Sequence, residues 1–359
     1  MNHRIRLLGI DLDGTLLTMK KELTDAARAA IEDAIRAGIE VVPVTGRPLT
    51  GVPAEVLGIP GIRYVISSNG ANTYALRGGA GDSQRAGDGK KAENGNTAES
   101  GNTVESGNTA GNGNAAGYRQ KAGGGPETGL YETDRKGAVG PDGIDWEELR
   151  VLRKVHMPHK AVRRVLEAAP GDDVIREIFV RGIGYHDERT QRMLEARFEI
   201  APPILSYINR SRRIVTDFET LLSDEGSHVE NISLMFTSQE ARDEAFARIR
   251  KIRRRDGGRL LHVLLPWRTD LEITHADADK WEALRDLADH LGVSADEVMA
   301  IGDGDNDRPM LRGAGLSFAM GNAPDFVKET ADYITKDNEH DGAAAAIRKM
   351  LEAREKSGS

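Results

Sequence analysis

The chain has 359 residues and no cysteine, and only 5% of its residues are aromatic. Without cysteine, disulfide bonds and thiolate metal ligands are excluded, so a bound metal must be held by oxygen or imidazole. Long hydrophobic runs are missing too. The apolar stretch within residues 1–10 is too short for a signal peptide, and no segment is long enough to span a bilayer. We therefore expect a cytoplasmic protein without a membrane partner.

An excess of positive charge is also missing. The formal net charge is -8 and the isoelectric point is about 5.7, so the composition predicts no nucleic-acid partner. Two short basic segments stand out against this background. We interpret Arg250–Arg255 as a solvated helix end, where cations complement the helix dipole. Asn209–Arg213 is either a surface loop or a contact for an anionic substrate, and both interpretations stay open.

Large apolar residues are nearly absent from residues 77–128. This segment contains Gly-Asn-Thr-Ala-Glu-Ser, Gly-Asn-Thr-Val-Glu-Ser and Gly-Asn-Thr-Ala in succession. Because such a composition cannot bury a core, we predict a disordered insertion, with a binding role as the less favoured alternative. The insertion is expected at the tip of a hairpin formed by residues 72–76 and 129–133.

Alternating apolar strands and helices at both ends of the chain predict the fold class. Strand-like runs occupy residues 5–10, 39–44, 64–67, 298–301 and 316–319, and Thr24 and Gly38 are suited to start and end the first helix. We predict an α/β fold with a doubly wound, mostly parallel, Rossmann-like core. The predicted domains are the core at 1–145 and 269–359, with an inserted α+β cap at 146–268.

The middle of the chain has a different order of predicted helices and strands. Residues 162–169 predict an amphipathic helix, and residues 174–180, 232–236 and 260–265 predict strands. Thr237 and Glu240 have the spacing of a capping box for a later helix. These elements predict a second domain whose cleft with the first is the natural binding site.

Two carboxylates follow the first strand-like run, in the sequence Asp11-Leu12-Asp13-Gly14-Thr15. Side chains two residues apart on an extended chain point the same way, so these carboxylates are expected on one side. One can attack phosphorus while the other transfers protons, provided that a metal offsets their charge. The alternative is an acidic turn whose side chains cap backbone groups.

A second acidic loop, Gly302–Asp307, follows the strand-like run at 298–301. In a parallel sheet this loop would emerge at the same edge as Asp11, so both loops could share one magnesium ion. The alternate aspartates of the loop also match the opening of a calcium loop. That alternative is disfavoured because the required glycine is replaced by Arg308 and the closing glutamate by Ala314.

Four further residues are candidates for binding phosphate: Thr45, Gly46 and Arg47 after one strand-like run, and Lys280 at the start of a helix. A hydroxyl, backbone amides and cations at such positions can hold phosphate oxygens. Taken singly, a threonine before glycine is usually a turn residue and a helical lysine is usually solvated. Their combination with the acidic loops favours phosphate binding.

In order along the chain, these motifs resemble those of the haloacid dehalogenase superfamily, specifically its Cof-type phosphatases with a class IIB cap. The four motifs are Asp11–Leu17, Val44–Arg47, Lys280 and Gly302–Leu311, and Ser68–Ala71, Leu271–Thr274 and Met320–Ala323 are further marks of that branch. One departure is Trp281, which follows the motif lysine where this branch commonly has glycine.

The resemblance implies a magnesium-dependent phosphatase that hydrolyses a small phosphorylated metabolite, such as a sugar phosphate, through an aspartyl-phosphate. It implies Asp11 as nucleophile and Asp13 as general acid and base. It further implies phosphate or substrate binding by Thr45, Gly46, Arg47, Asn69, Lys280, Asn306 and Asn322, and Mg²⁺ binding by Asp11, the Asp13 carbonyl, Asp303 and Asp307. A phosphomutase or a dedicated sugar-phosphate phosphatase is the alternative. A non-catalytic phosphate sensor is less favoured because the whole acidic set is present.

Overall fold

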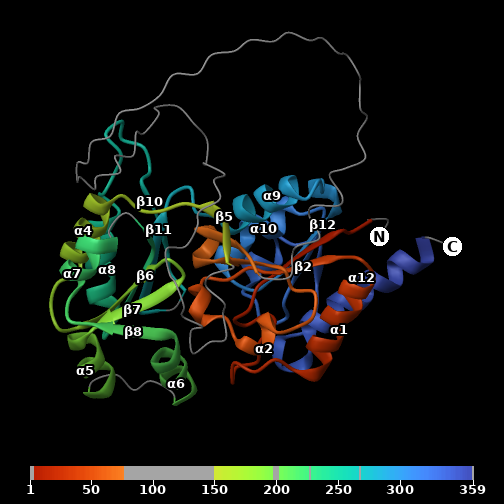
Figure 1. The fold of residues 1–359 in the computed structure, drawn as a ribbon, viewed down its shortest axis with the longest axis horizontal. Helices are drawn as coiled ribbons and strands as arrows, with labels where there is room; N and C mark the ends of the chain where they lie inside the picture. Colours follow the sequence, from red (N-terminus) through yellow and green to blue (C-terminus); the bar gives the residue numbers. More distant parts are fainter. Residues whose placement is uncertain (1–3, 77–148, 197–201, 226–227, 267, 358–359) are drawn as a thin grey trace, which may run out of the picture.

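The computed structural model describes residues 4–76, 149–196, 202–225, 228–266 and 268–357. Residues 77–128, predicted as an insertion, lie outside this part. Figure 1 shows two bodies side by side, and the strands of the described residues form sheets of five, six and three strands. We call the body around the five-stranded sheet the core and the body around the six-stranded sheet the cap.

The core sheet is parallel throughout, with the order β14-β13-β12-β1-β2. Its strands are β1 (Leu7–Ile10), β2 (Glu40–Pro43), β12 (Val298–Gly302), β13 (Leu316–Ala319) and β14 (Tyr333–Ile334). In the register, Leu7 lies opposite both Val298 and Glu40. The first and last parts of the chain therefore fold together, as the alternating pattern predicts.

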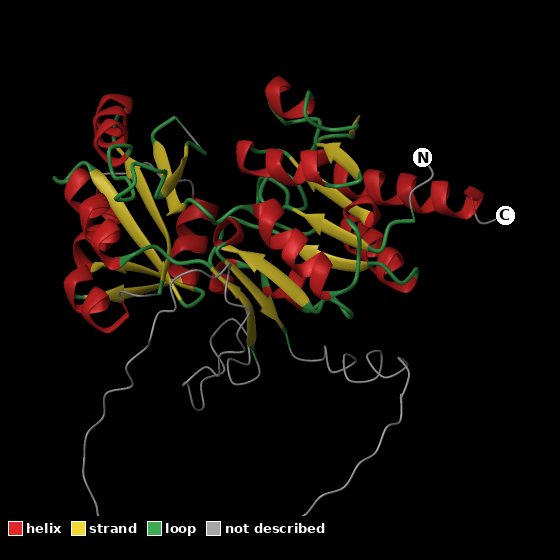
Figure 2. Ribbon diagram, turned by 90° about the horizontal axis from the view of Figure 1, so that it is seen from above, coloured by secondary structure: helices red, strands yellow, loops and turns green. Residues whose placement is uncertain are grey.

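Helices cover both faces of the core sheet, which is why its central strands are continuous apolar runs (Figure 2). On one face α1 (Asp25–Arg36) packs on α12 (Gly342–Ser357), and on the other α9 (Lys280–His290) packs on α10 (Arg308–Gly313). The predicted cap of α1 is confirmed, because the Thr24 hydroxyl accepts a hydrogen bond from the Ala27 amide. The short helices α2 (Ala54–Leu57) and α11 (Asp325–Lys328) complete the core.

A three-stranded antiparallel sheet extends the core through β3 (Tyr64–Ser67), β4 (Asn72–Ala75) and β5 (Arg150–Lys154). It joins the core sheet where the Thr45 amide donates to the Ile66 carbonyl, 2.9 Å away. The predicted hairpin between residues 72–76 and 129–133 is wrong, because both edges of β4 are already paired with β3 and β5. Residues 129–133 themselves lie outside the described residues.

The cap is a six-stranded sheet in the order β10-β11-β9-β6-β7-β8, antiparallel except for the β7–β8 pair. Its strands are β6 (Val174–Val180), β7 (Ile183–Asp187), β8 (Arg212–Val215), β9 (Val229–Phe236), β10 (Leu261–Leu264) and β11 (Asp270–His275). Its helices are α4 (His159–Ala168), α5 (Glu188–Ala196), α6 (Pro202–Ser211), α7 (Phe218–Glu225) and α8 (Gln239–Ile249). The fold class, a parallel core with an inserted cap, is thereby confirmed.

Two predictions about the cap concern the start of α8 and the domain boundaries. The predicted capping box at Thr237 and Glu240 is wrong: Ser238 is the N-cap of α8, and its hydroxyl accepts from the Ala241 amide at 3.1 Å. The helix begins one residue later than predicted because Ser238 keeps an extended backbone. The domain boundaries at 145 and 268 stay predictions, although β11 pairs within the cap sheet. No helix among the described residues is long and apolar enough to cross a membrane.

Candidate active site

The acidic residues meet at the carboxyl ends of two adjacent strands. Ile10 at the end of β1 lies opposite Ile301 in β12, so the residues that follow both strands emerge at one edge of the sheet. One carboxylate oxygen from each of Asp11, Asp303 and Asp307 lies within 4.8 Å of the others. We call these three residues the acidic triad. The prediction that Asp11 and Asp303 lie on the same side of the molecule is confirmed.

Lys280 lies among the carboxylates of the triad. Its Nζ donates to Asp11 Oδ1 at 2.7 Å and to Asp307 Oδ1 at 2.6 Å, and the residue is only 1% exposed. Asp279 fixes the first turn of α9, since its side chain accepts from the amides of Trp281 and Glu282. Burial alone would lower the pKa of Lys280, but the two aspartates raise it. The lysine is therefore held as an ammonium group.

One ammonium group does not balance three carboxylates. Burial and the neighbouring Asp307 raise the pKa of Asp11 well above its ordinary value, and the same two causes raise the pKa of Asp303 to about 7. Burial is the larger cause of both shifts, and repulsion between the carboxylates adds to it in a site built from oxygen donors. Such a donor set fits a hard divalent cation, so the triad could hold a metal ion.

Backbone and hydroxyl donors fix the two acidic loops against each other. Asp307 Oδ2 accepts from the amides of Asp303 and Gly304, at 2.9 and 2.8 Å. The Thr15 hydroxyl donates to Asp303 Oδ1 at 3.0 Å and thereby links the first loop to the second. Gly14 has a φ of +80°, and a Cβ there would lie 2.3 Å from Asp303 Oδ2. Only glycine fits this position without displacing the triad.

Asp13 has different partners from the triad. Arg47 donates from Nε and Nη2 to its two carboxylate oxygens, both at 2.6 Å, and Lys21 Nζ lies 2.7 Å from Oδ1. Burial alone would raise the pKa of Asp13, but hydrogen bonds and charge from Arg47, followed by Lys21, lower it. The Asp13 side chain is therefore a paired carboxylate, and its predicted metal contact through the backbone carbonyl stays a prediction.

The remaining candidate residues surround these groups. The Thr45 hydroxyl is buried and accepts from the Arg47 amide, and a Cβ on Gly46 would lie 3.1 Å from Asn69 Oδ1. Asn69 accepts from Asn306 Nδ2 at 2.9 Å. Asn322 donates to the Gly14 carbonyl and to Asp303 Oδ2, at 2.8 and 3.2 Å. All the predicted site residues thus belong to one connected polar region.

Besides Thr15 and Asp279, three residues that contact the predicted site residues were not themselves predicted as site residues. Glu272 accepts from Asn69 Nδ2 at 2.6 Å, and burial raises its pKa. The sequence offered a signal for Glu272, since it lies within the Leu271–Thr274 motif. Lys21 and the cap residue Tyr207, whose ring lies against Arg47, carry no motif. Nothing local in the sequence indicates that Lys21 approaches Asp13 or that Tyr207 approaches Arg47.

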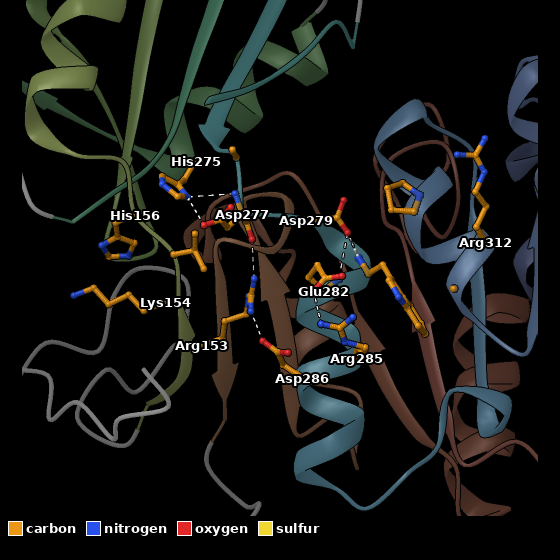
Figure 3. A pocket seen from close by; sticks show the side chains of 15 residues that line it. Arg153, Lys154, His156, His275, Asp277, Asp279, Glu282, Arg285, Asp286 and Arg312 are labelled. Atoms are coloured by element: carbon orange, nitrogen blue, oxygen red, sulfur yellow. Dashed lines mark hydrogen bonds and ion pairs between the residues drawn. The ribbon is translucent and has the colours of Figure 1, made fainter. Parts of the chain in front are cut away.

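A separate cavity of about 980 Å³ lies on the other side of α9 (Figure 3). It is lined by Glu282, Arg285 and Asp286 of this helix and by Arg153 of β5, which forms an ion pair with Asp286. Lys280 shares the opposite, buried face of α9 with Ala283, Leu284 and Leu287. The cavity is therefore distinct from the acidic triad.

Comparison with known proteins identifies the family to which the chain belongs. The family model of haloacid dehalogenase-like hydrolases matches residues 8–81 and 139–347, which is most of the chain. The chain belongs to this family. The predicted resemblance is confirmed, including the inserted cap of the Cof-type branch.

The haloacid dehalogenase-like chain is similar to individual phosphatases and to solved structures of this family. It is 26% identical to phosphatase YwpJ of Bacillus subtilis, over 97% of this chain and 100% of the relative. It is 50% identical over 80 residues to the 5-amino-6-(5-phospho-D-ribitylamino)uracil phosphatase YcsE of Bacillus subtilis, covering 22% of this chain but only 32% of that relative's length. A solved haloacid dehalogenase-like hydrolase from B. subtilis has the same fold, with a TM-score of 0.65, 22% identity and coverage of 96% and 99% of the two chains.

Proposed function

We propose that the protein is a magnesium-dependent phosphatase that hydrolyses a small phosphorylated metabolite through an aspartyl-phosphate on Asp11. The observation that carries this proposal is the acidic triad around Lys280. A carboxylate next to a fixed ammonium group and surplus negative charge is suited to attack a phosphoryl group when a divalent cation is also bound. The family membership supports the same chemistry.

In the first step, an Asp11 carboxylate oxygen attacks phosphorus and the bond from phosphorus to the ester oxygen breaks. Asp13 gives a proton to that departing oxygen. In the second step, water attacks phosphorus, Asp13 takes its proton, and the bond between phosphorus and Asp11 breaks to release inorganic phosphate. Lys280 stabilises negative charge on the transferring group throughout, because its ammonium contacts Asp11 directly.

The remaining residues of this chain bind and orient. Thr45, Gly46 and Asn69 would bind phosphate oxygens through a hydroxyl, a backbone amide and a side-chain amide. Asn306, which donates to Asn69, would orient it. Asp303, Asp307 and Asp11 would hold Mg²⁺, with the Asp13 carbonyl as a further ligand. When bound, the ion would offset the negative charge that gathers on the phosphoryl oxygens.

Asp13 needs a proton for the first step and a free carboxylate for the second. Its ion pairs with Arg47 and Lys21 suit the second step. A substrate phosphate competes with Asp13 for these two cations, so substrate binding favours the protonated form that the first step requires. Arg47 therefore serves both substrate binding and the state of Asp13.

The test compares wild type with Asp11→Asn, using para-nitrophenyl phosphate with Mg²⁺ and with EDTA. We expect kcat of the variant to fall by at least about a thousandfold, because the amide cannot form an acyl phosphate. Asp305→Asn is the matched control, since this exposed aspartate lies on the second acidic loop but outside the triad, where it binds Arg308. Thermal melting of both variants checks that they fold. Unchanged turnover in Asp11→Asn would overturn the proposal.

For the substrate class, we propose a sugar phosphate or a similar phosphomonoester. A panel of sugar phosphates, nucleotides and cofactor phosphates ranks the candidates by kcat/KM. The panel includes 5-amino-6-(5-phospho-D-ribitylamino)uracil because of the relative YcsE. Transfer of the phosphoryl group to an added sugar, instead of water, would identify the alternative phosphomutase.

A further inference from the structure

Two hydrogen bonds donated by Thr50 join the core to the cap next to Arg47. The 3-10 turn Leu49–Gly51 follows Arg47, and its Thr50 amide donates to the Gly182 carbonyl between β6 and β7, at 2.9 Å. The Thr50 hydroxyl donates to the Ser211 carbonyl at the end of α6, at 3.0 Å. Helix α6 therefore lies over the segment that carries Arg47.

Tyr207 of α6 contacts Arg47 directly. The guanidinium carbon of Arg47 lies 4.4 Å from the centre of the Tyr207 ring, a distance typical of a cation–π contact. The edges of the same guanidinium are hydrogen-bonded: Nε and Nη2 bind Asp13, and Nη1 donates to the Gly51 carbonyl at 2.8 Å. Arg47 is thus held between a carboxylate of the core and an aromatic ring of the cap.

Tyr207 is in turn fixed within the cap. The Arg212 guanidinium carbon lies 5.2 Å from its ring centre, and Arg212 Nη1 lies 3.3 Å from its hydroxyl. Arg212 is held by two hydrogen bonds to Glu177 of β6, at 2.9 and 3.0 Å, and both side chains of this pair are buried. A paired, buried guanidinium makes a rigid support, so the ring has a defined position relative to the cap sheet.

The core leaves room for this ring. A Cβ on Gly51 would lie 2.6 Å from the Tyr207 hydroxyl oxygen, although the φ of Gly51 is not in the left-handed region. A larger residue at position 51 would therefore displace the Tyr207 hydroxyl, although the backbone of Gly51 itself does not demand glycine. The Tyr207 ring and the turn Leu49–Gly51 therefore lie in close contact.

We propose that Tyr207 is a positioning residue for the reaction: when the cap lies on the core, its ring holds the Arg47 guanidinium in place against Asp13. This inference rests on the proposed function, since it assigns Asp13 a part in the reaction. Its consequence is that the Asp13 side chain is correctly oriented only while the cap covers the site. Cap closure and the orientation of the acid and base are then linked through one side chain.

A double-mutant cycle tests whether Tyr207 acts through Arg47. The variants are Tyr207→Leu, Arg47→Lys and both together, assayed with the best substrate of the panel and Mg²⁺. We expect Tyr207→Leu to lower kcat by about ten- to hundredfold with Arg47 present, because a small misplacement of a reacting group has effects of this size. In the Arg47→Lys background the same substitution is expected to change kcat by less than about twofold. Equal losses in both backgrounds would overturn the inference.

A chemical readout independent of turnover follows the position of Arg47. Arg47 is only 7% exposed, so phenylglyoxal should modify it slowly in the wild type and several times faster in Tyr207→Leu, as measured by mass spectrometry. The matched control is Phe246→Leu on α8, which also removes a cap ring next to an arginine, Arg250 at 5.9 Å. This control should change neither kcat nor the modification of Arg47. Unchanged Arg47 modification in Tyr207→Leu would also overturn the inference.

The two proposals fail in different ways. If Asp11→Asn keeps its turnover, the proposed function is wrong whatever Tyr207 does. If Asp11→Asn is inactive but Tyr207→Leu has wild-type kcat and KM, the phosphatase stands and the positioning role of Tyr207 is wrong. A Tyr207→Phe variant, which keeps the ring and loses the hydroxyl contact with Arg212, should retain most of the activity. A loss as large as that of Tyr207→Leu would contradict a role of the ring.

Discussion

The core and the cap both bury charged side chains, but they do so in different ways. In the cap, Glu177 and Arg212 form a closed pair of one carboxylate and one guanidinium. In the core, Lys280 contacts two aspartates, and a third lies within the same small space. The cap pair is balanced and supports its neighbours, whereas the core group has a surplus of negative charge. In these two groups the imbalance of buried charge, more than burial itself, separates the reactive site from the structural pair.

The largest effect is expected when this imbalance is increased. Lys280→Met leaves Asp11 and Asp307 buried without their cation, which should lower the free energy of unfolding by about 3–5 kcal/mol and abolish hydrolysis. Urea unfolding in EDTA, followed by tryptophan fluorescence, measures the change. Lys21→Met is the matched control, since this more exposed lysine pairs with Asp13 and should cost about 1 kcal/mol or less. If both variants lost the same free energy of unfolding, the buried carboxylates of the core would be no more sensitive to losing their cation than the more exposed Asp13, which would contradict this prediction.

The core part of the site could be predicted because its residues follow strand ends. Apolar runs predicted β1 and β12. Because parallel strands bring their carboxyl ends to one edge of the sheet, Asp11 and Asp303 were expected to lie close together. The partners of Asp13 were not predictable in the same way. Arg47 belongs to a motif, but its contact with Tyr207 depends on how the cap sits on the core. The position of the cap on the core produces no periodic pattern or residue spacing from which it could be predicted.

The cap itself was only partly predictable. β6 and β9 are apolar, β-branched runs and were expected as strands. The start of β8 lies in the basic segment Asn209–Arg213, which was predicted as either a surface loop or a contact for an anionic substrate and not as a strand. The N-cap of α8 illustrates a smaller error. Thr237 and Ser238 are both good capping residues, and only the backbone geometry selects Ser238. The residue types therefore limited the N-cap to Thr237 or Ser238 but could not decide between them.

A second comparison concerns the contact between core and cap, where Glu230 of β9 is buried. Its carboxylate accepts from the Ser68 hydroxyl of the core at 2.9 Å and from the Gly182 amide of the cap at 2.7 Å, with the Tyr74 hydroxyl at 3.5 Å. Burial raises the pKa of Glu230 to about 7, despite these hydrogen bonds. The folded protein therefore keeps a proton that the unfolded chain loses near the ordinary value of 4.5.

This difference predicts an intermediate effect of pH. Because the folded state binds more protons between about pH 4.5 and pH 7, the contribution of Glu230 to the free energy of unfolding falls as pH rises through that window, by up to about 3 kcal/mol. Glu230→Gln cannot titrate, so its free energy of unfolding should fall less between pH 5 and pH 8 than that of the wild type. Urea unfolding at both pH values measures the difference. The exposed Glu219→Gln serves as control, and a wild-type slope in Glu230→Gln would contradict the assignment.

The smallest effect is expected from deleting residues 77–128. Residues 77–128 lie between β4 and β5, which already pair with each other, and their composition predicts no contribution to a core. Deleting them leaves residues 129–148 to connect the two strands. Because the entropy of closing a loop changes slowly with its length, the deletion should raise the free energy of unfolding by only about 1 kcal/mol or less and leave kcat and KM unchanged. A marked fall in melting temperature would mean that the segment packs on the core or cap. Unchanged stability with an altered KM would instead mean that the segment takes part in binding substrate. In that case the activity would depend on this segment as well as on the core and the cap.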